Sequence, residues 1–119
     1  MNRKLLGEQG EKWARDFLKK KGYRITETNY RCREGEIDII AEQKDCLVFV
    51  EVRTRTGSDF GSPEESVTPA KKEKLVSLAL GYLQNHRKVP PYWRFDVVAI
   101  EVGRDGKPVR MDLIVNAID

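Results

Sequence analysis

The sequence is poor in the residues that build disulfide and transition-metal sites. It contains two cysteines, Cys32 and Cys46, and a single histidine, His86. Two cysteines are too few for a disulfide framework or a cysteine-rich zinc site, and one histidine cannot form a histidine cluster around a metal. We therefore expect no thiol or imidazole chemistry, so any reaction has to use carboxylates, Lys, Arg, Ser, Thr or Tyr.

Long apolar stretches are also missing. No run approaches the roughly 18 apolar residues that a membrane-spanning helix needs, and the first residues lack the apolar stretch of a signal peptide. The glycines fit no nucleotide-binding spacing. We therefore expect a cytoplasmic protein with no membrane partner and no nucleotide cofactor. The length of 119 residues predicts a single domain, residues 1–119, that is large enough to bury a core without disulfides.

Positive charge is concentrated at one end of the chain. The formal net charge is only +3, but residues 1–34 contain ten Lys or Arg against five Asp or Glu. Such an excess favours a polyanionic partner, although a solvated helix face rich in lysine produces the same pattern. Charge alone leaves both interpretations open.

Hydrophobic periodicity predicts two helices and five strands. Apolar residues at spacings of three and four predict helices over residues 5–21 and 69–86, and Thr68 followed by Pro69 is typical of the start of the second. Runs rich in β-branched and aromatic residues predict strands over residues 23–30, 36–42, 46–55, 93–102 and 109–115.

The order of these elements predicts an α/β fold. Helix, three strands, helix and two strands favour a mixed sheet with helices packed on it. We expect residues 36–42 and 46–55 to form an antiparallel hairpin through Gln43, Lys44 and Asp45, and the strand after the second helix to join the sheet beside that hairpin. A loop containing Gly57, Gly61 and Pro63 precedes the second helix.

The predicted hairpin carries acids where strands usually avoid them. If it turns on Lys44 and Asp45, Asp38 lies directly opposite Glu51. Two carboxylates in this position repel each other unless a cation lies between them, and a divalent metal is one such cation. Arg53 on the same face is the competing explanation, and a register shifted by one residue separates the two acids altogether.

Four segments of the chain resemble the YraN family of small bacterial proteins. They are residues 7–11, 35–41, 47–55 and 94–98, and the match covers nearly the whole chain. Through that family the sequence resembles the restriction-endonuclease-like PD-(D/E)xK nuclease superfamily, in particular the archaeal Holliday junction resolvases. The resemblance implies a restriction-endonuclease-like mixed sheet flanked by helices in the order α-β-β-β-α-β-β, which agrees with the order derived above.

The resemblance also assigns a metal site. It implies that Asp38 and Glu51 hold Mg²⁺ or Mn²⁺ at the phosphate to be cut, and that Glu11 of the first helix completes the site. Arg53 stands where the superfamily has Lys. Because Arg stays protonated, it can clamp a phosphate but cannot take a proton from water.

Further basic residues complete the predicted site. Lys71 matches a lysine of the YraN pattern and is a candidate for a supporting phosphate contact, whereas Lys72 is expected to extend along the edge of the core into solvent. Arg31, Arg33 and Arg55 are expected to hold the nucleic-acid backbone. Asp96 and His86 are expected to be structural.

These features lead to three competing functions. The first is a Mg²⁺-dependent endonuclease that hydrolyses DNA, preferred over RNA, in branched or single-stranded form. The second is a nucleic-acid-binding protein that keeps the nuclease fold and has lost turnover through Arg53. The third is a protein-interaction module without a nucleic-acid partner. A homodimer is compatible with the first, because a small nuclease addresses two strands more easily as a pair.

Overall fold

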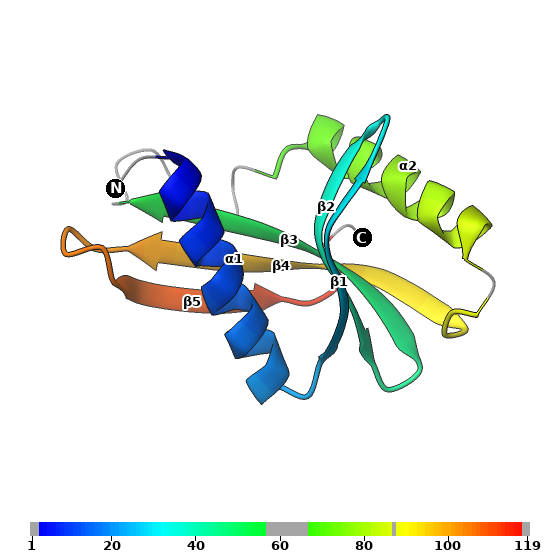
Figure 1. Ribbon diagram of the computed structural model, residues 1–119, viewed down its shortest axis with the longest axis horizontal. Coiled ribbons are helices and arrows are strands. Elements are labelled where there is room, and N and C mark those ends of the chain that lie inside the picture. The colour runs from blue at the N-terminus through cyan, green and yellow to red at the C-terminus, as the bar shows by residue number, and fades with distance from the viewer. Residues whose placement is uncertain (1–2, 57–66, 87, 118–119) are drawn as a thin grey trace.

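The computed structural model describes residues 3–56, 67–86 and 88–117 (Figure 1). The loop predicted around Gly57, Gly61 and Pro63 lies outside these ranges. Within them, no helix is long and apolar enough to cross a membrane. The described elements are α1 (Arg3–Lys20), β1 (Arg24–Cys32), β2 (Gly35–Gln43), β3 (Cys46–Thr56), α2 (Pro69–Asn85), β4 (Tyr92–Val102) and β5 (Pro108–Ile114).

The five strands form one mixed sheet in the order β1-β2-β3-β4-β5. All neighbours pair antiparallel except β3 and β4, which are parallel and are joined through α2. The predicted α/β class, the order α-β-β-β-α-β-β and the place of β4 beside the hairpin are therefore confirmed. This architecture is consistent with a restriction-endonuclease-like fold.

A helix covers each face of the sheet, so the core has two layers (Figure 1). On the α1 side, Ala14 and Leu18 pack on Val48, Val50 and the buried face of β4. The α2 side is built from buried apolar residues of the helix and the sheet, Leu75, Leu78, Tyr82, Leu47, Phe49 and Phe95 among them. Because both faces of the sheet are covered, the sequences of β3 and β4 contain nearly continuous apolar runs.

The hairpin of β2 and β3 has the predicted register. Lys44 and Asp45 form its turn, with Lys44 in the left-handed region at φ 56°. The ladder runs from the pair Gln43 and Cys46 to the pair Ile39 and Val50. In this register Asp38 and Glu51 are the next residues on their strands, as the sequence predicted.

The start of α2 also agrees with the sequence. Thr68 is the N-cap, its Oγ1 accepts a hydrogen bond from the Lys71 backbone N–H at 3.3 Å, and Pro69 follows at the first position of the helix. At the other end, His86 is half-buried and stacks on Tyr82 with ring centroids 3.7 Å apart. The prediction of a structural histidine at the core edge is confirmed.

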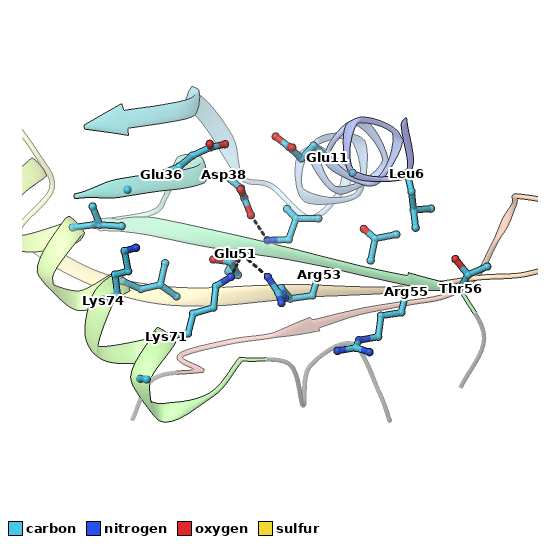
Figure 2. Close-up of a pocket in the computed structure, with 17 residues that line it drawn as sticks. Leu6, Glu11, Glu36, Asp38, Glu51, Arg53, Arg55, Thr56, Lys71 and Lys74 are labelled. Atoms are coloured by element: carbon cyan, nitrogen blue, oxygen red, sulfur yellow. Dashed lines mark hydrogen bonds and ion pairs between the residues drawn. The ribbon is translucent and has the colours of Figure 1, made fainter. Parts of the chain in front are cut away.

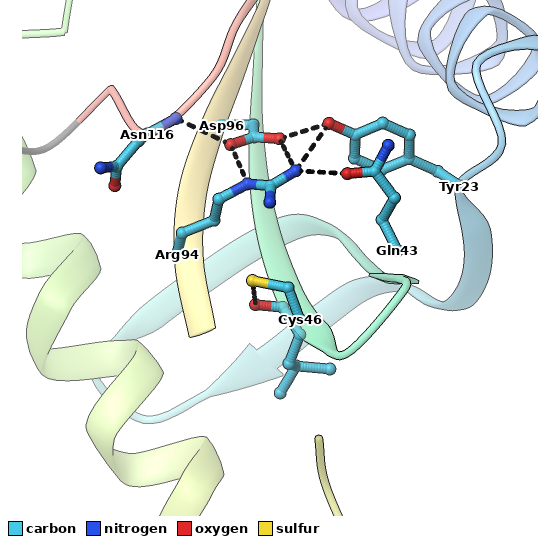
Figure 3. A network of polar contacts seen from close by, with 7 residues as sticks. Tyr23, Gln43, Cys46, Arg94, Asp96 and Asn116 are labelled. Carbon is cyan, nitrogen blue, oxygen red and sulfur yellow. Dashed lines mark hydrogen bonds and ion pairs between the residues drawn. The ribbon is translucent and has the colours of Figure 1, made fainter. Parts of the chain in front are cut away.

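A polar network holds the first and last thirds of the chain together (Figure 3). Asp96 of β4 is fully buried and accepts hydrogen bonds from the Tyr23 hydroxyl at 2.7 Å, Arg94 Nε at 3.0 Å and the Asn116 backbone N–H at 2.9 Å. Arg94 also donates to Gln43 at 2.7 Å. Burial, followed by the Asp96 carboxylate, raises the pKa of Tyr23 to about 12. Asp96 is therefore a structural acid, as predicted.

Strand β1 is longer than the alternation in the sequence indicated. The prediction ended at Tyr30, whereas β1 continues to Cys32, which pairs with Gly35 across a turn of Arg33 and Glu34. This second tight hairpin extends beyond the central sheet, and its far end stands beside α2 (Figure 1).

Candidate functional site

The candidate site lies where β2 and β3 part. Their ladder ends at Ile39 and Val50, and beyond this pair β3 continues to Thr56 beside β4 alone. The space between the diverging strands is an open cleft of about 1070 Å³, with α1 on one side and α2 on the other (Figure 2). Four acids line it, Glu11, Glu36, Asp38 and Glu51, and four cations line it, Arg53, Arg55, Lys71 and Lys74.

A local irregularity in β2 places Asp38 in the cleft. Ile37 packs on the α2 side of the sheet and Ile39 on the α1 side, so the usual alternation of faces is broken at Asp38. Its carboxylate bridges the gap between the strands, because Oδ2 accepts a hydrogen bond from the Val52 backbone N–H at 2.8 Å. This bond fixes Asp38 beside Glu51.

Glu51 is the most buried acid of the cleft, with 6% of its surface exposed. Two cations neutralise it, since Arg53 Nη1 lies 3.5 Å and Lys71 Nζ 3.7 Å from the same carboxylate oxygen, Oε1 (Figure 2). A buried carboxylate needs such partners, because taking an isolated charge out of water is costly.

Asp38 has no such cationic partner among the described residues. Burial, followed by the repulsion of Glu51, raises the pKa of the Asp38 carboxyl to about 8, although the hydrogen bond from the Val52 N–H lowers it, and Glu11 adds a weaker repulsion. A carboxyl with a raised pKa marks a place where an added positive charge is favourable. The site is therefore electrostatically short of a cation at Asp38.

Glu11 of α1 reaches the cleft from the other side. Asn29, in the left-handed region at φ 52°, lies between two acids, and with its amide turned so that the nitrogen faces them it donates to Glu11 Oε1 at 2.8 Å and to Glu36 Oε1 at 3.0 Å. Burial, followed by the neighbouring Glu36, raises the pKa of Glu11. An uncharged amide thus bridges two carboxylates that repel each other.

The donor set allows Mg²⁺ but does not form a complete cage. Among the described residues, no group of three or more His, Cys, Asp and Glu side chains is placed to hold a metal ion. Magnesium needs only one or two carboxylates, because waters and substrate phosphates complete its coordination. Asp38 and Glu51 fit this requirement, and Glu11 lines the same cleft from α1.

The predicted basic residues divide into two groups. Arg53, Arg55 and Lys71 line the cleft, whereas Arg31 and Arg33 do not. Arg31 Nε lies 3.3 Å from Glu36 Oε2 on the neighbouring strand. Lys72, which we expected to lie along the core edge, is also absent from the cleft lining.

The sequence did not predict Lys74, which lines the cleft, or Asn29, which lies beside the cleft acids Glu11 and Glu36. Lys74 follows Lys71 by three positions, and this helical spacing could have revealed that the two lysines share a face. Asn29 carried no such signal, because its contacts depend on how β1 lies against α1 and β2.

Comparison with known proteins places the chain among close relatives. The model of the family described as "Uncharacterised protein family UPF0102" matches residues 10–100. A UPF0102 protein of Symbiobacterium thermophilum is 51% identical over 112 residues, 94% of each chain. One of Pelotomaculum thermopropionicum is 46% identical over 115 residues, covering 97% of this chain and 96% of its own. These matches confirm the predicted resemblance at the level of the family. Because they extend over nearly the full length of both proteins, the chain belongs to the UPF0102 family.

Proposed function

We propose that this protein is a metal-dependent nuclease that hydrolyses phosphodiester bonds of DNA with Mg²⁺ or Mn²⁺. The observation that carries the proposal is the pairing of Asp38 with Glu51 in an open cleft that also holds four cationic side chains. Acids for a metal and cations for phosphate oxygens are the two groups that phosphodiester hydrolysis requires.

Asp38 and Glu51 would hold the ion through their carboxylate oxygens. When bound, the ion would neutralise phosphate oxygens and lower the pKa of a water molecule. The Val52 N–H keeps the Asp38 carboxylate oriented toward Glu51, so this pair needs little rearrangement to take up a cation. Glu11 would add a ligand from α1, because a carboxylate that accepts a hydrogen bond through one oxygen keeps the other.

In this proposal Arg53 and Lys71 together take the role of the single lysine in the PD-(D/E)xK pattern. Arg53 stays protonated and presents a planar fork of donors, which suits clamping of the negative charge that develops on the phosphate. Lys71 comes from α2 to the same Glu51 oxygen and brings the ammonium group that β3 lacks. Lys71 is therefore our candidate for orienting the attacking water.

The test is cleavage of labelled DNA with EDTA, Mg²⁺ or Mn²⁺, using single-stranded, flapped and four-way substrates. We expect metal-dependent cleavage that Asp38→Ala and Glu51→Ala each reduce by at least about 10³-fold, as for loss of a group that acts only in the transition state. Arg24→Ala is the control, because Arg24 pairs with Glu42 at the surface and neither residue lines the cleft. Equal cleavage by wild type and Asp38→Ala would refute the proposal.

Arg53 also supports a second candidate function, a nucleic-acid-binding protein without turnover. Because Arg cannot release a proton, any help that a basic side chain gives to water activation has to come from a lysine of α2 rather than from β3. If wild type binds DNA in a salt-dependent manner without cutting it, and Arg53→Lys creates cleavage, the second function holds. Absence of any salt-dependent binding would instead support a protein-interaction module.

A further inference from the structure

The amino end of α2 carries positive charge where helices prefer negative charge. Its first turn contains no acid and holds Lys71 and Lys72, and Glu73 and Lys74 come next. Cations in the first turn of a helix oppose the macrodipole. A local preference that a sequence violates repeatedly is typical of a functional site rather than of a stabilising surface.

Among the described residues two lysines line the cleft, and only Lys71 forms an ion pair with one of the two paired acids. Lys71 contacts Glu51 at 3.7 Å. Lys74 lines the same cleft, but no hydrogen bond or ion pair joins its ammonium group to the rest of the described chain. Its charge is thus available to a ligand.

The Lys74 side chain is exposed and has a close neighbour at the start of β2. It lies across Gly35, where an added Cβ atom would come within 3.2 Å of Lys74 Cε and 3.4 Å of Leu78 Cδ1. Gly35 adopts φ 153°, a conformation that favours glycine, so the start of β2 leaves this space open. Figure 2 shows Lys74 on the α2 wall of the cleft, beside Lys71.

We propose that Lys74, with the amino end of α2, binds a backbone phosphate next to the one held at Asp38 and Glu51. The inference rests on the proposed function and extends it to a second phosphate subsite. The ligand is a phosphodiester anion, because a protonated amine and the positive end of a helix dipole both attract it. Gly35 lets the lysine stem lie flat, so that the ammonium group faces the cleft.

The test compares Lys74→Gln with Lys72→Gln, since both remove one positive charge from the same helix but only Lys74 lines the cleft. Binding of a fluorescein-labelled single-stranded 20-mer DNA is measured by anisotropy between 50 and 200 mM salt. Both changes are made in an Asp38→Asn background, so that cleavage does not interfere. We expect Lys74→Gln to weaken binding severalfold and to make the slope of log affinity against log salt shallower by about 0.7, the value for one phosphate contact.

We expect Lys72→Gln to leave that slope unchanged. Equal slopes for the two variants, or a parent protein without salt-dependent binding, would overturn the inference. Inorganic phosphate at millimolar concentration identifies the source of the anion. Competition by phosphate alone, with no difference between the two variants on DNA, indicates a free-anion site and also contradicts the proposal.

A kinetic readout separates this inference from the proposed function. With Asp38 intact, Lys74→Gln should raise KM for the DNA while kcat stays within about twofold, because the lysine contacts a phosphate that does not react. If no variant or metal gives cleavage but the salt slopes differ as expected, the nuclease proposal fails and the subsite stands. If cleavage depends on Asp38 but the two variants give equal salt slopes, the subsite at Lys74 fails and the nuclease proposal stands.

Discussion

Asp38 illustrates how a functional residue opposes stability. Its carboxyl is half-buried next to Glu51, and among the described residues no Lys or Arg forms an ion pair with it, whereas Glu51 has two such partners. Between the pKa of an aspartate in an unfolded chain, about 3.9, and the raised value in the folded protein, the folded state binds more protons. The free energy of unfolding contributed by Asp38 therefore falls as pH rises through that window.

Replacing Asp38 with Asn should consequently stabilise the metal-free protein. The Asn side chain keeps an oxygen that can accept the Val52 N–H but removes the charge. We expect thermal or urea unfolding in EDTA to give Asp38→Asn a stability advantage that is near zero below about pH 4, grows as pH rises above that value, and reaches at least about 1.4 kcal/mol at pH 8, the equivalent of one pKa unit.

The effect of added metal on the unfolding temperature is a second test of the role of Asp38. Addition of Mg²⁺ or Mn²⁺ should raise the unfolding temperature of the wild type and leave that of Asp38→Asn nearly unchanged, because only the carboxylate binds the ion. A wild type that is more stable than Asp38→Asn at pH 8 in EDTA would show that Asp38 is not strained by its neighbours.

At the residue scale, the sequence could predict the acid pair but not its surroundings. Asp38 and Glu51 follow from a two-residue turn and a fixed count along two strands, both of which are local properties. Asn29 and Lys74 enter the site through packing between segments far apart in the chain. For Lys74 the helical spacing from Lys71 was a usable signal, whereas no local pattern reports the packing that places Asn29.

At the scale of elements, the contact of α1 with β3 fixes how far Glu11 reaches. Gly10 lies directly over Thr54, and a Cβ atom at Gly10 would overlap Thr54 Oγ1 and come within 3.2 Å of Thr54 Cβ. The absence of a side chain at this position lets the helix approach the sheet closely. Since Glu11 follows Gly10, the same close approach carries its carboxylate into the cleft.

Gly10→Ala should therefore destabilise the protein even though alanine is the better helix former. Overpacking of a tight contact costs about 1 to 3 kcal/mol, which exceeds the gain of about 1 kcal/mol from helix propensity. Urea unfolding measures the difference. The same change at Gly7, where no atom lies within 4 Å, should be neutral or stabilising.

The double variant Gly10→Ala, Thr54→Ala tests the cause. Removal of the Thr54 hydroxyl should restore most of the lost stability, giving a coupling energy of at least about 0.5 kcal/mol. Additive effects of the two changes would show that the Gly10 contact does not set the distance between α1 and the sheet.

At the scale of the whole molecule, stability depends on the network around Asp96. This carboxylate joins Tyr23 at the start of β1, Arg94 in β4 and Asn116 near the end of the described chain. Three distant parts of the sequence therefore share one buried acid.

Asp96→Asn should cost about 3 kcal/mol or more in urea unfolding, since removing one partner of a buried pair leaves the other charge uncompensated. Asp112→Asn is the matched control, because Asp112 also pairs with an arginine, Arg110, but is half exposed. We expect that control to change stability by less than about 1 kcal/mol. Similar losses for the two variants would contradict a central role for Asp96.

Much of the fold was predictable because its pairings are local. The hairpin of β2 and β3, the two helices and the place of β4 follow from periodicity, turn residues and short connections. The separation of β2 from β3 at Asp38 was not predictable, because it arises where β2 turns toward α2 while β3 continues beside β4. The site sits at that departure from regular pairing.

The parallel pairing of β3 with β4 has a consequence for assembly. Cys46 pairs with Tyr92, so this is the sheet's only non-local junction among the described strands, and the chain between them includes α2. The chain loses the loop-closure entropy of that junction when α2 docks on the sheet. The same docking brings Lys71 and Lys74 to the acids of the hairpin. Topology thus makes completion of the sheet and completion of the cleft a single step, and a chain that has not joined its two halves has no composite site.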